Sequence, residues 1–200
     1  MLPRKLICAV LIVGAFNFTS CAPKSNLDLL YSIIERSVDR ITEQLPGSVN
    51  KFRFKFNSPG DFSSLENRVI NYFQQKELIG GEAQDSNAYT LNYTIENINI
   101  NYPEAFREGF LGDYKVERDV SVSISFNLSN EDEILLSDVF TDAAKDSIKY
   151  SDIESVESHG LKFTQSEKPS APFFDSLLEP VIAVSTLIVS IILLFTVRSK

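Results

Sequence analysis

An uncharged run near the C-terminus is the feature that most constrains this chain. Residues 180–197 carry no charged side chain, and Val, Ile, Leu and Phe make up most of them. As a helix, residues 181–197 would extend about 26 Å at about 1.5 Å per residue, close to the thickness of a bilayer core. The run therefore predicts a transmembrane helix over 180–197, an interfacial segment over 173–179 and a cytoplasmic tail over 198–200.

The N-terminus has the pattern of a secretory signal. Arg4 and Lys5 precede a mostly apolar run over residues 6–18, which is too short to span a membrane. The run ends in Phe18-Thr-Ser-Cys21, which resembles the lipobox of bacterial lipoproteins, where small residues precede a cysteine. The resemblance implies cleavage after residue 20, acylation of Cys21 (palmitate) and a lipidated tether over 21–25. An ordinary signal peptide with a cysteine nearby is the alternative.

Basic residues at the two ends predict the topology. Arg198 and Lys200 follow the last apolar run, as Arg4 and Lys5 precede the first. Basic residues favour the cytoplasmic side of a membrane. We therefore expect a bacterial cell-membrane protein whose main domain lies in the periplasm, with the outer membrane as the alternative location.

The middle of the chain predicts two helices. Apolar residues recur at steps of three or four over 27–45, after a capping box at Ser25 and Asp28, and Pro46-Gly47 ends this helix. A second helix is expected between Ser63-Ser64 and a terminating pair of glycines at 80–81.

Alternating patterns predict the strands. Apolar and polar residues alternate over 52–56, 89–95 and 120–128, and a short apolar run covers 134–140. A one-residue slip at 96–97 indicates a β-bulge. The expected fold class is α+β, with two helices packed on one face of a mainly antiparallel sheet of about four strands. This domain would cover 26–141, and the Ser-rich, acidic stretch at 142–172 predicts a flexible linker before the transmembrane helix.

The charge and the residue inventory exclude several classes of function. The net charge of the chain is −8, and removal of residues 1–20 would make it more negative by two. Such a balance disfavours nucleic acid and anionic lipid surfaces as partners. His159 is the one histidine and has no Cys or His partner outside the signal peptide. We therefore expect no metal site, no catalytic residues and no cofactor, and we expect that the chain is not an enzyme.

The segment between the second and third predicted strands is longer than a hairpin turn requires. It carries aromatic residues at steps of four. One interpretation is a partner-binding loop; the other is that the rings fold back onto the sheet. The candidate partner-binding residues are Tyr102, Phe106, Arg107, Phe110 and Tyr114.

The order helix–strand–helix–strand after a lipobox is similar to periplasmic assembly lipoproteins of the curli-export and flagellar-accessory kind, whose core is like the amino-terminal domain of TolB. The resemblance covers roughly residues 27–100. It implies a non-catalytic envelope lipoprotein that scaffolds or assists assembly of an envelope protein complex. A periplasmic module that binds a lipid or small ligand is the alternative, and the oligomeric state stays open.

Overall fold

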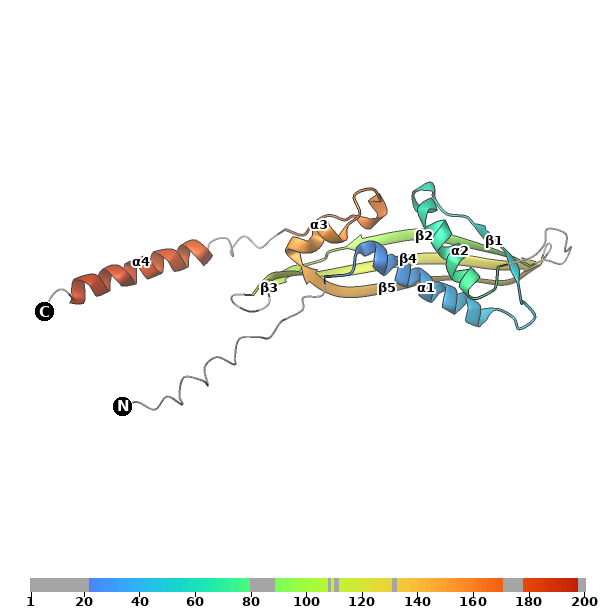
Figure 1. The fold of residues 1–200 in the computed structure, drawn as a ribbon, viewed down its shortest axis with the longest axis horizontal. Helices are drawn as coiled ribbons and strands as arrows, with labels where there is room; N and C mark the ends of the chain where they lie inside the picture. Colours follow the sequence, from blue (N-terminus) through green and yellow to red (C-terminus); the bar gives the residue numbers. More distant parts are fainter. Residues whose placement is uncertain are drawn as a thin grey trace, which may run out of the picture.

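The computed structural model describes residues 22–79, 89–107, 109, 112–130, 133–170 and 178–197. The helices are α1 (Asn26–Gln44), α2 (Glu66–Gln75), α3 (Ile153–Val156) and α4 (Leu178–Val197), with 3-10 turns at Gly60–Leu65, Tyr150–Asp152 and Lys162–Thr164. The strands are β1 (Phe52–Phe56), β2 (Tyr89–Asn101), β3 (Ala105–Arg107), β4 (Tyr114–Asn130) and β5 (Glu133–Lys149). Helices α1, α2 and α3 form one layer on one side of a twisted sheet, and Figure 1 shows α4 apart from the sheet.

The sheet is mixed and has five strands, which corrects the expected sheet of about four mainly antiparallel strands. β4 pairs with β5 along one side, and with β2 and then the short β3 along the other. β1 pairs with β2 in parallel, because α2 lies between these strands and returns the chain to the same end of the sheet. The sequence patterns indicated strands but not their directions.

The register follows the alternating sequence closely. Along β4 every second residue from Val116 to Leu128 is buried, and the predicted core residue Val122 is fully covered. The β2–β4 register shifts between Ile95 and Asn97, where the sequence indicates a bulge. The extra residue returns Ile98 and Ile100 to the helix-covered face, so one core continues along the whole strand.

Helix α1 begins at the predicted capping box and packs across the sheet. Ser25 Oγ accepts from the backbone N–H of Asp28, and the Asp28 side chain accepts in return from the backbone N–H of Ser25. Aromatic rings fill the layer between helices and strands, with Phe52 and Phe73 edge to face at 5.4 Å. The buried hydroxyl of Tyr93 lies 2.9 Å from Ser37 Oγ on α1. Burial raises the pKa of Tyr93, and the hydrogen bond to Ser37 acts in the opposite direction.

Strand β5 corrects the predicted flexible linker. It continues to Lys149, far beyond the expected end of the strand at Phe140. The pattern hid it because its helix-facing positions include Asp138, Asp142 and Asp146, which no apolar period reveals. These carboxylates pair with Arg40 at 3.4 Å, with Arg36 at 2.7 Å and with Arg118 at 2.5 Å.

Two of these aspartates, Asp138 and Asp142, protect the outer edge of β5. Asp138 Oδ1 accepts from the backbone N–H of Val139 at 2.8 Å, and Asp142 Oδ1 accepts from that of Ala143 at 2.7 Å. Arg36 Nη2 also donates to the carbonyl of Ala143. An edge strand with unpaired backbone groups is a template for pairing with other chains, and charged side chains placed this way oppose it.

The chain after β5 also packs on the domain. Ile153 and Val156 of α3 are buried, and the rings of Phe62 and Phe163 meet edge to face at 5.7 Å. Residues 150–164 therefore complete the helical layer, and most of the stretch expected to be a linker is part of the folded domain.

Helix α4 corrects the last part of the expected fold class. Within the described part of the chain, no helix is long and apolar enough to cross a membrane. The expected signal peptide, Cys21 and tail, and nearly all of the interfacial segment, lie outside the described residues.

Candidate functional site: the entry end of the domain and the open sheet face

A buried arginine organises the end of the domain where the chain enters. Arg118 lies in the inward phase of β4, and its side chain is completely buried. Nε and Nη2 donate to the two carboxylate oxygens of Asp146 at 2.8 and 2.5 Å. Nη1 donates to the carbonyl of Lys24 and to Oδ1 of Asn26, at 2.8 and 2.9 Å. One guanidinium thus joins β4, β5 and the segment that enters the domain.

Asn26 extends this cluster to the segment after α3. Its side-chain amide is fully buried and donates to the Tyr102 hydroxyl and to the carbonyl of Thr164, both at 2.8 Å. Burial raises the pKa of Tyr102 to about 12, against the opposing hydrogen bond from Asn26. The first residue of α1, the end of β2 and the segment after α3 are therefore held together by one polar network.

Sequence reasoning missed this network. The available signal was Arg118 itself, a cation at an inward position between Val116 and Val120 in the clearest alternating pattern of the chain. A charge at such a position requires a buried partner. The sequence does not reveal the partners, because they lie far away along the chain.

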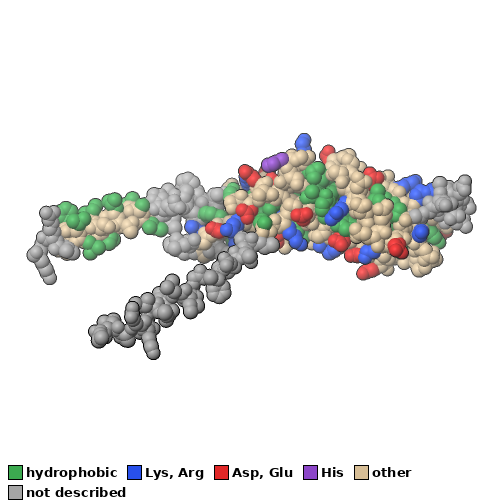
Figure 2. All heavy atoms as spheres, viewed as in Figure 1, with side chains coloured by type: hydrophobic (Ala, Val, Ile, Leu, Met, Phe, Trp, Pro, Cys, Tyr) green, Lys and Arg blue, Asp and Glu red, His purple; other side chains and the backbone are tan. Residues whose placement is uncertain are grey.

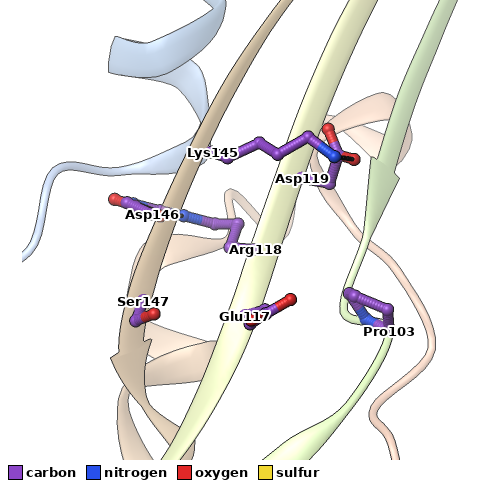
Figure 3. Close-up of a pocket in the computed structure, with 7 residues that line it drawn as sticks. All are labelled: Pro103, Glu117, Arg118, Asp119, Lys145, Asp146 and Ser147. Atoms are coloured by element: carbon purple, nitrogen blue, oxygen red, sulfur yellow. Dashed lines mark hydrogen bonds and ion pairs between the residues drawn. The ribbon is translucent and has the colours of Figure 1, made fainter.

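A small hollow opens beside the network. It measures about 210 Å³. Figure 3 shows the Lys145 side chain extending from β5 over β4 to Asp119, with which it forms an ion pair at 2.7 Å. The Arg118–Asp146 pair lies nearby in the same view. The residues around it are Pro103, Glu117, Arg118, Asp119, Lys145, Asp146 and Ser147.

The chemistry of this end is structural. Four of the guanidinium contacts of Arg118 are made to protein groups, so the cation is already neutralised and fixed. The described residues contain no cluster of His, Cys, Asp and Glu that could hold a metal ion. The arrangement holds the entering segment firmly, and it presents no activated nucleophile.

The structure separates the five residues predicted to bind a partner. Tyr102 is 3% exposed and belongs to the polar network, so it is unavailable to a partner. Phe106, on β3, is 37% exposed. Arg107 donates from Nε to the carbonyl of Gly112 and lies over the ring of Tyr114 at 5.4 Å. Phe110 lies outside the described residues. The long predicted loop is therefore largely a hairpin, with β3 paired to the start of β4.

A second hollow, of about 470 Å³, lies between the turn before β3 and residues 167–170. Its walls come from Asn101, Tyr102, Pro103, Glu104, Ala105, Glu167, Lys168, Pro169 and Ser170. In Figure 1 the start of α1 and the segment after α3 both approach the end of the sheet that carries β3. The entering and leaving segments thus share one end of the domain.

The sheet face opposite the helices is open. None of the outward-facing residues that the structure describes on β2, β4 and β5 is buried. Small neutral polar residues dominate its centre, and they bond across strands: Asn92 Nδ2 donates to Asn127 Oδ1 at 2.8 Å, and Ser123 and Thr141 hydroxyls lie 2.9 Å apart. We call this surface the open face. Its central members are Thr90, Asn92, Thr94, Ser121, Ser123, Ser125, Asn127 and Ser129.

The helical side of the molecule carries charged side chains of both signs. Figure 2, in the same view as Figure 1, shows Lys and Arg interspersed with Asp and Glu over the domain. Exposed ion pairs such as Lys76–Asp39 at 2.6 Å belong to this helical side.

No family model and no curated protein matches the chain. Among solved structures, the chain is similar to a minor lipoprotein from Acinetobacter baumannii, with 12% identity, coverage of 56% of this chain and 80% of that chain, and a TM-score of 0.34. It is also similar to a protein described as a homolog of neuraminyllactose-binding hemagglutinin from Helicobacter pylori, with 11% identity, coverage of 52% and 69%, and a TM-score of 0.30. Scores this low assign neither a family nor a function to the chain.

Proposed function

We propose that this chain is a non-catalytic lipoprotein of the bacterial cell envelope, anchored by an acyl group on Cys21, whose open face docks another envelope protein. The observation that carries the proposal is the contrast between the two faces of the sheet. Helices bury one face, whereas the other is left uncovered along three long strands.

The composition of the open face supports docking. Ser, Thr and Asn lose less side-chain entropy on binding than Lys or Glu, and they cost less to dehydrate than charged groups. Recognition surfaces of antibodies use Ser and Asn for adaptable hydrogen bonds. A partner that contributes its own rigid side chains would therefore bind this face at a low cost in side-chain entropy and dehydration.

The packed layer between helices and sheet argues against the alternative of a ligand-binding module. The ring centroids of Phe54 and Phe73 lie 5.5 Å apart, and those of Phe73 and Tyr93 lie 6.3 Å apart. Aromatic rings therefore occupy the space that a ligand would need. The two hollows described above lie at the surface and are lined mainly by polar residues.

The docking proposal is tested by site-specific photocrosslinking in living cells. A photoreactive residue at Ser123 should form an adduct of one defined mass, and a second substitution, Ser125→Arg, should abolish it by placing a large cation on the face. The matched control is the same photoreactive residue at Glu43, on the helical side. An adduct from position 43 and none from position 123 would contradict docking by the open face.

Acylation is tested separately. The intact mass of the processed chain should show an acyl modification that Cys21→Ser removes. Equal masses, apart from the substitution itself, would contradict the anchor but leave the docking test unaffected.

A further inference from the structure

We infer that the row formed by Phe106, Lys115 and Lys149, where β3 pairs with the start of β4, is a lipid-contacting surface, on which Phe106 enters the headgroup layer of the bilayer that holds the anchor. The inference rests on the proposed function in one respect, because it takes Cys21 as the point of attachment. It assigns Phe106 to the phospholipid surface instead of to a protein partner.

The first step of the argument is the shortness of the tether. The carbonyl of Lys24 accepts from Arg118 Nη1 at 2.8 Å, so the chain is already fixed to the domain at residue 24. Fully extended chain covers at most about 3.6 Å per residue, so Cys21 can lie no more than about 11 Å from Lys24. An anchor on Cys21 therefore holds this end of the domain against the membrane.

The second step is the reach of the hairpin. β4 runs from Tyr114 near the hairpin tip back through Lys115 to Arg118. At about 3.3 Å per residue, Lys115 lies about 10 Å beyond Arg118 toward the tip, and Phe106 is its direct partner on β3. The hairpin thus projects about as far as the extended tether can reach. If this end of the domain faces the membrane, Phe106 lies at about the same distance from the bilayer as Cys21.

The third step is the chemistry of the side chains there. Phe106, Lys115 and Lys149 are successive cross-strand partners and form one row on the open side of the sheet. Phe106 is 37% exposed as a residue, and the Lys149 ammonium pairs with Asp113 at 2.7 Å. Phe side chains on interfacial segments bury their apolar area at the boundary between headgroups and acyl chains, and lysine stems extend their ammonium groups toward lipid headgroups. This row combines both, although the chain as a whole is acidic.

The chain contains no tryptophan, so one introduced tryptophan reports on its own position. We would place the processed chain carrying Phe106→Trp in phospholipid vesicles with or without brominated acyl chains, which quench tryptophan on contact. The matched control is Val139→Trp, at an outward position of β5 that is 68% exposed. Its partner Ser125 lies about 33 Å farther along β4 than Lys115.

We expect brominated lipid to reduce the emission of Trp at position 106 about twofold and to leave position 139 nearly unchanged, as for an interfacial ring beside one in water. Lys115→Trp reports on the same row should Phe106→Trp fail to fold. Equal emission in the two kinds of vesicle at positions 106 and 115 would overturn the inference.

A second arm separates this inference from the proposed anchor. Unacylated processed chain is coupled through the Cys21 thiol to a maleimide lipid, and the quenching is measured again. Quenching at position 106 in this arm supports the hairpin contact even if the natural chain proves to lack the acyl group. An acylated chain without quenching at position 106 overturns the hairpin contact and leaves the proposed function standing.

Discussion

The two faces of the β2–β4–β5 sheet share one backbone but differ in composition and burial. On the helical face, β4 contributes Val120, Val122 and Ile124, all fully buried. On the open face, the residues between them are Ser121 and Ser123, which remain partly exposed. The difference shows that the apolar burial of this sheet lies on its helical face, and removal of apolar area from water is the dominant favourable contribution to folding. The other face is free to serve recognition.

The strongest test of this contrast removes a large ring from the helical side. Phe73→Ala should lower the free energy of unfolding by about 3–5 kcal/mol, since it deletes a fully buried ring that contacts Phe52 and Tyr93. The measurement is urea denaturation followed by circular dichroism. A loss below about 1 kcal/mol would show that the helices do not pack as described.

The second test asks whether the polar end of the helical face is also part of the fold. Arg118→Ala should cost about 2–4 kcal/mol, because it leaves Asp146, Asn26 and the Lys24 carbonyl without their buried donor. Asp39→Ala, which breaks the exposed pair with Lys76, is the control and should leave the melting temperature nearly unchanged. Equal melting temperatures for the two variants would mean that the hydrogen bonds of Arg118 do not stabilise the domain.

The third test uses the titration of Tyr102. Its folded-state pKa is raised to about 12, whereas an unfolded tyrosine titrates near 10, so the folded chain holds this proton more tightly. The stability it contributes is fully present below about pH 10 and is lost as the pH rises through about 12. Wild type should therefore lose on the order of 2 kcal/mol more than Tyr102→Phe over this range. Parallel pH profiles of the two proteins would contradict the buried hydroxyl.

The smallest effect belongs to the open face. Ser123→Ala removes the contact with Thr141 and should change the free energy of unfolding by less than about 0.5 kcal/mol, because both groups can bond to water. A destabilisation of several kcal/mol would show that this face is part of the core.

Several elements could be predicted from the sequence because their causes are local. The capping box at Ser25 and Asp28, the helical period of α1, and the alternation and bulge of β2 depend on neighbours a few residues away. The exposed position of Phe106 and the burial of Tyr102 could not be told apart in this way, because both are aromatic residues in one loop. What separates them is the amide of Asn26, which is distant in the chain and adjacent only in the fold.

The sequence by itself determined where α1 and β1 run, where the central parts of β2 and β4 lie, and which apolar residues there face inward, because apolar periodicity is a short-range property of the chain. Only the tertiary structure decided that β1 and β2 are parallel, that β5 continues through Asp142 and Asp146, and that Arg118 is buried. The physical reason is the same for the last two. A charged residue can occupy an inward position only when a distant partner neutralises it, and folding alone brings Arg36 and Arg118 to those carboxylates.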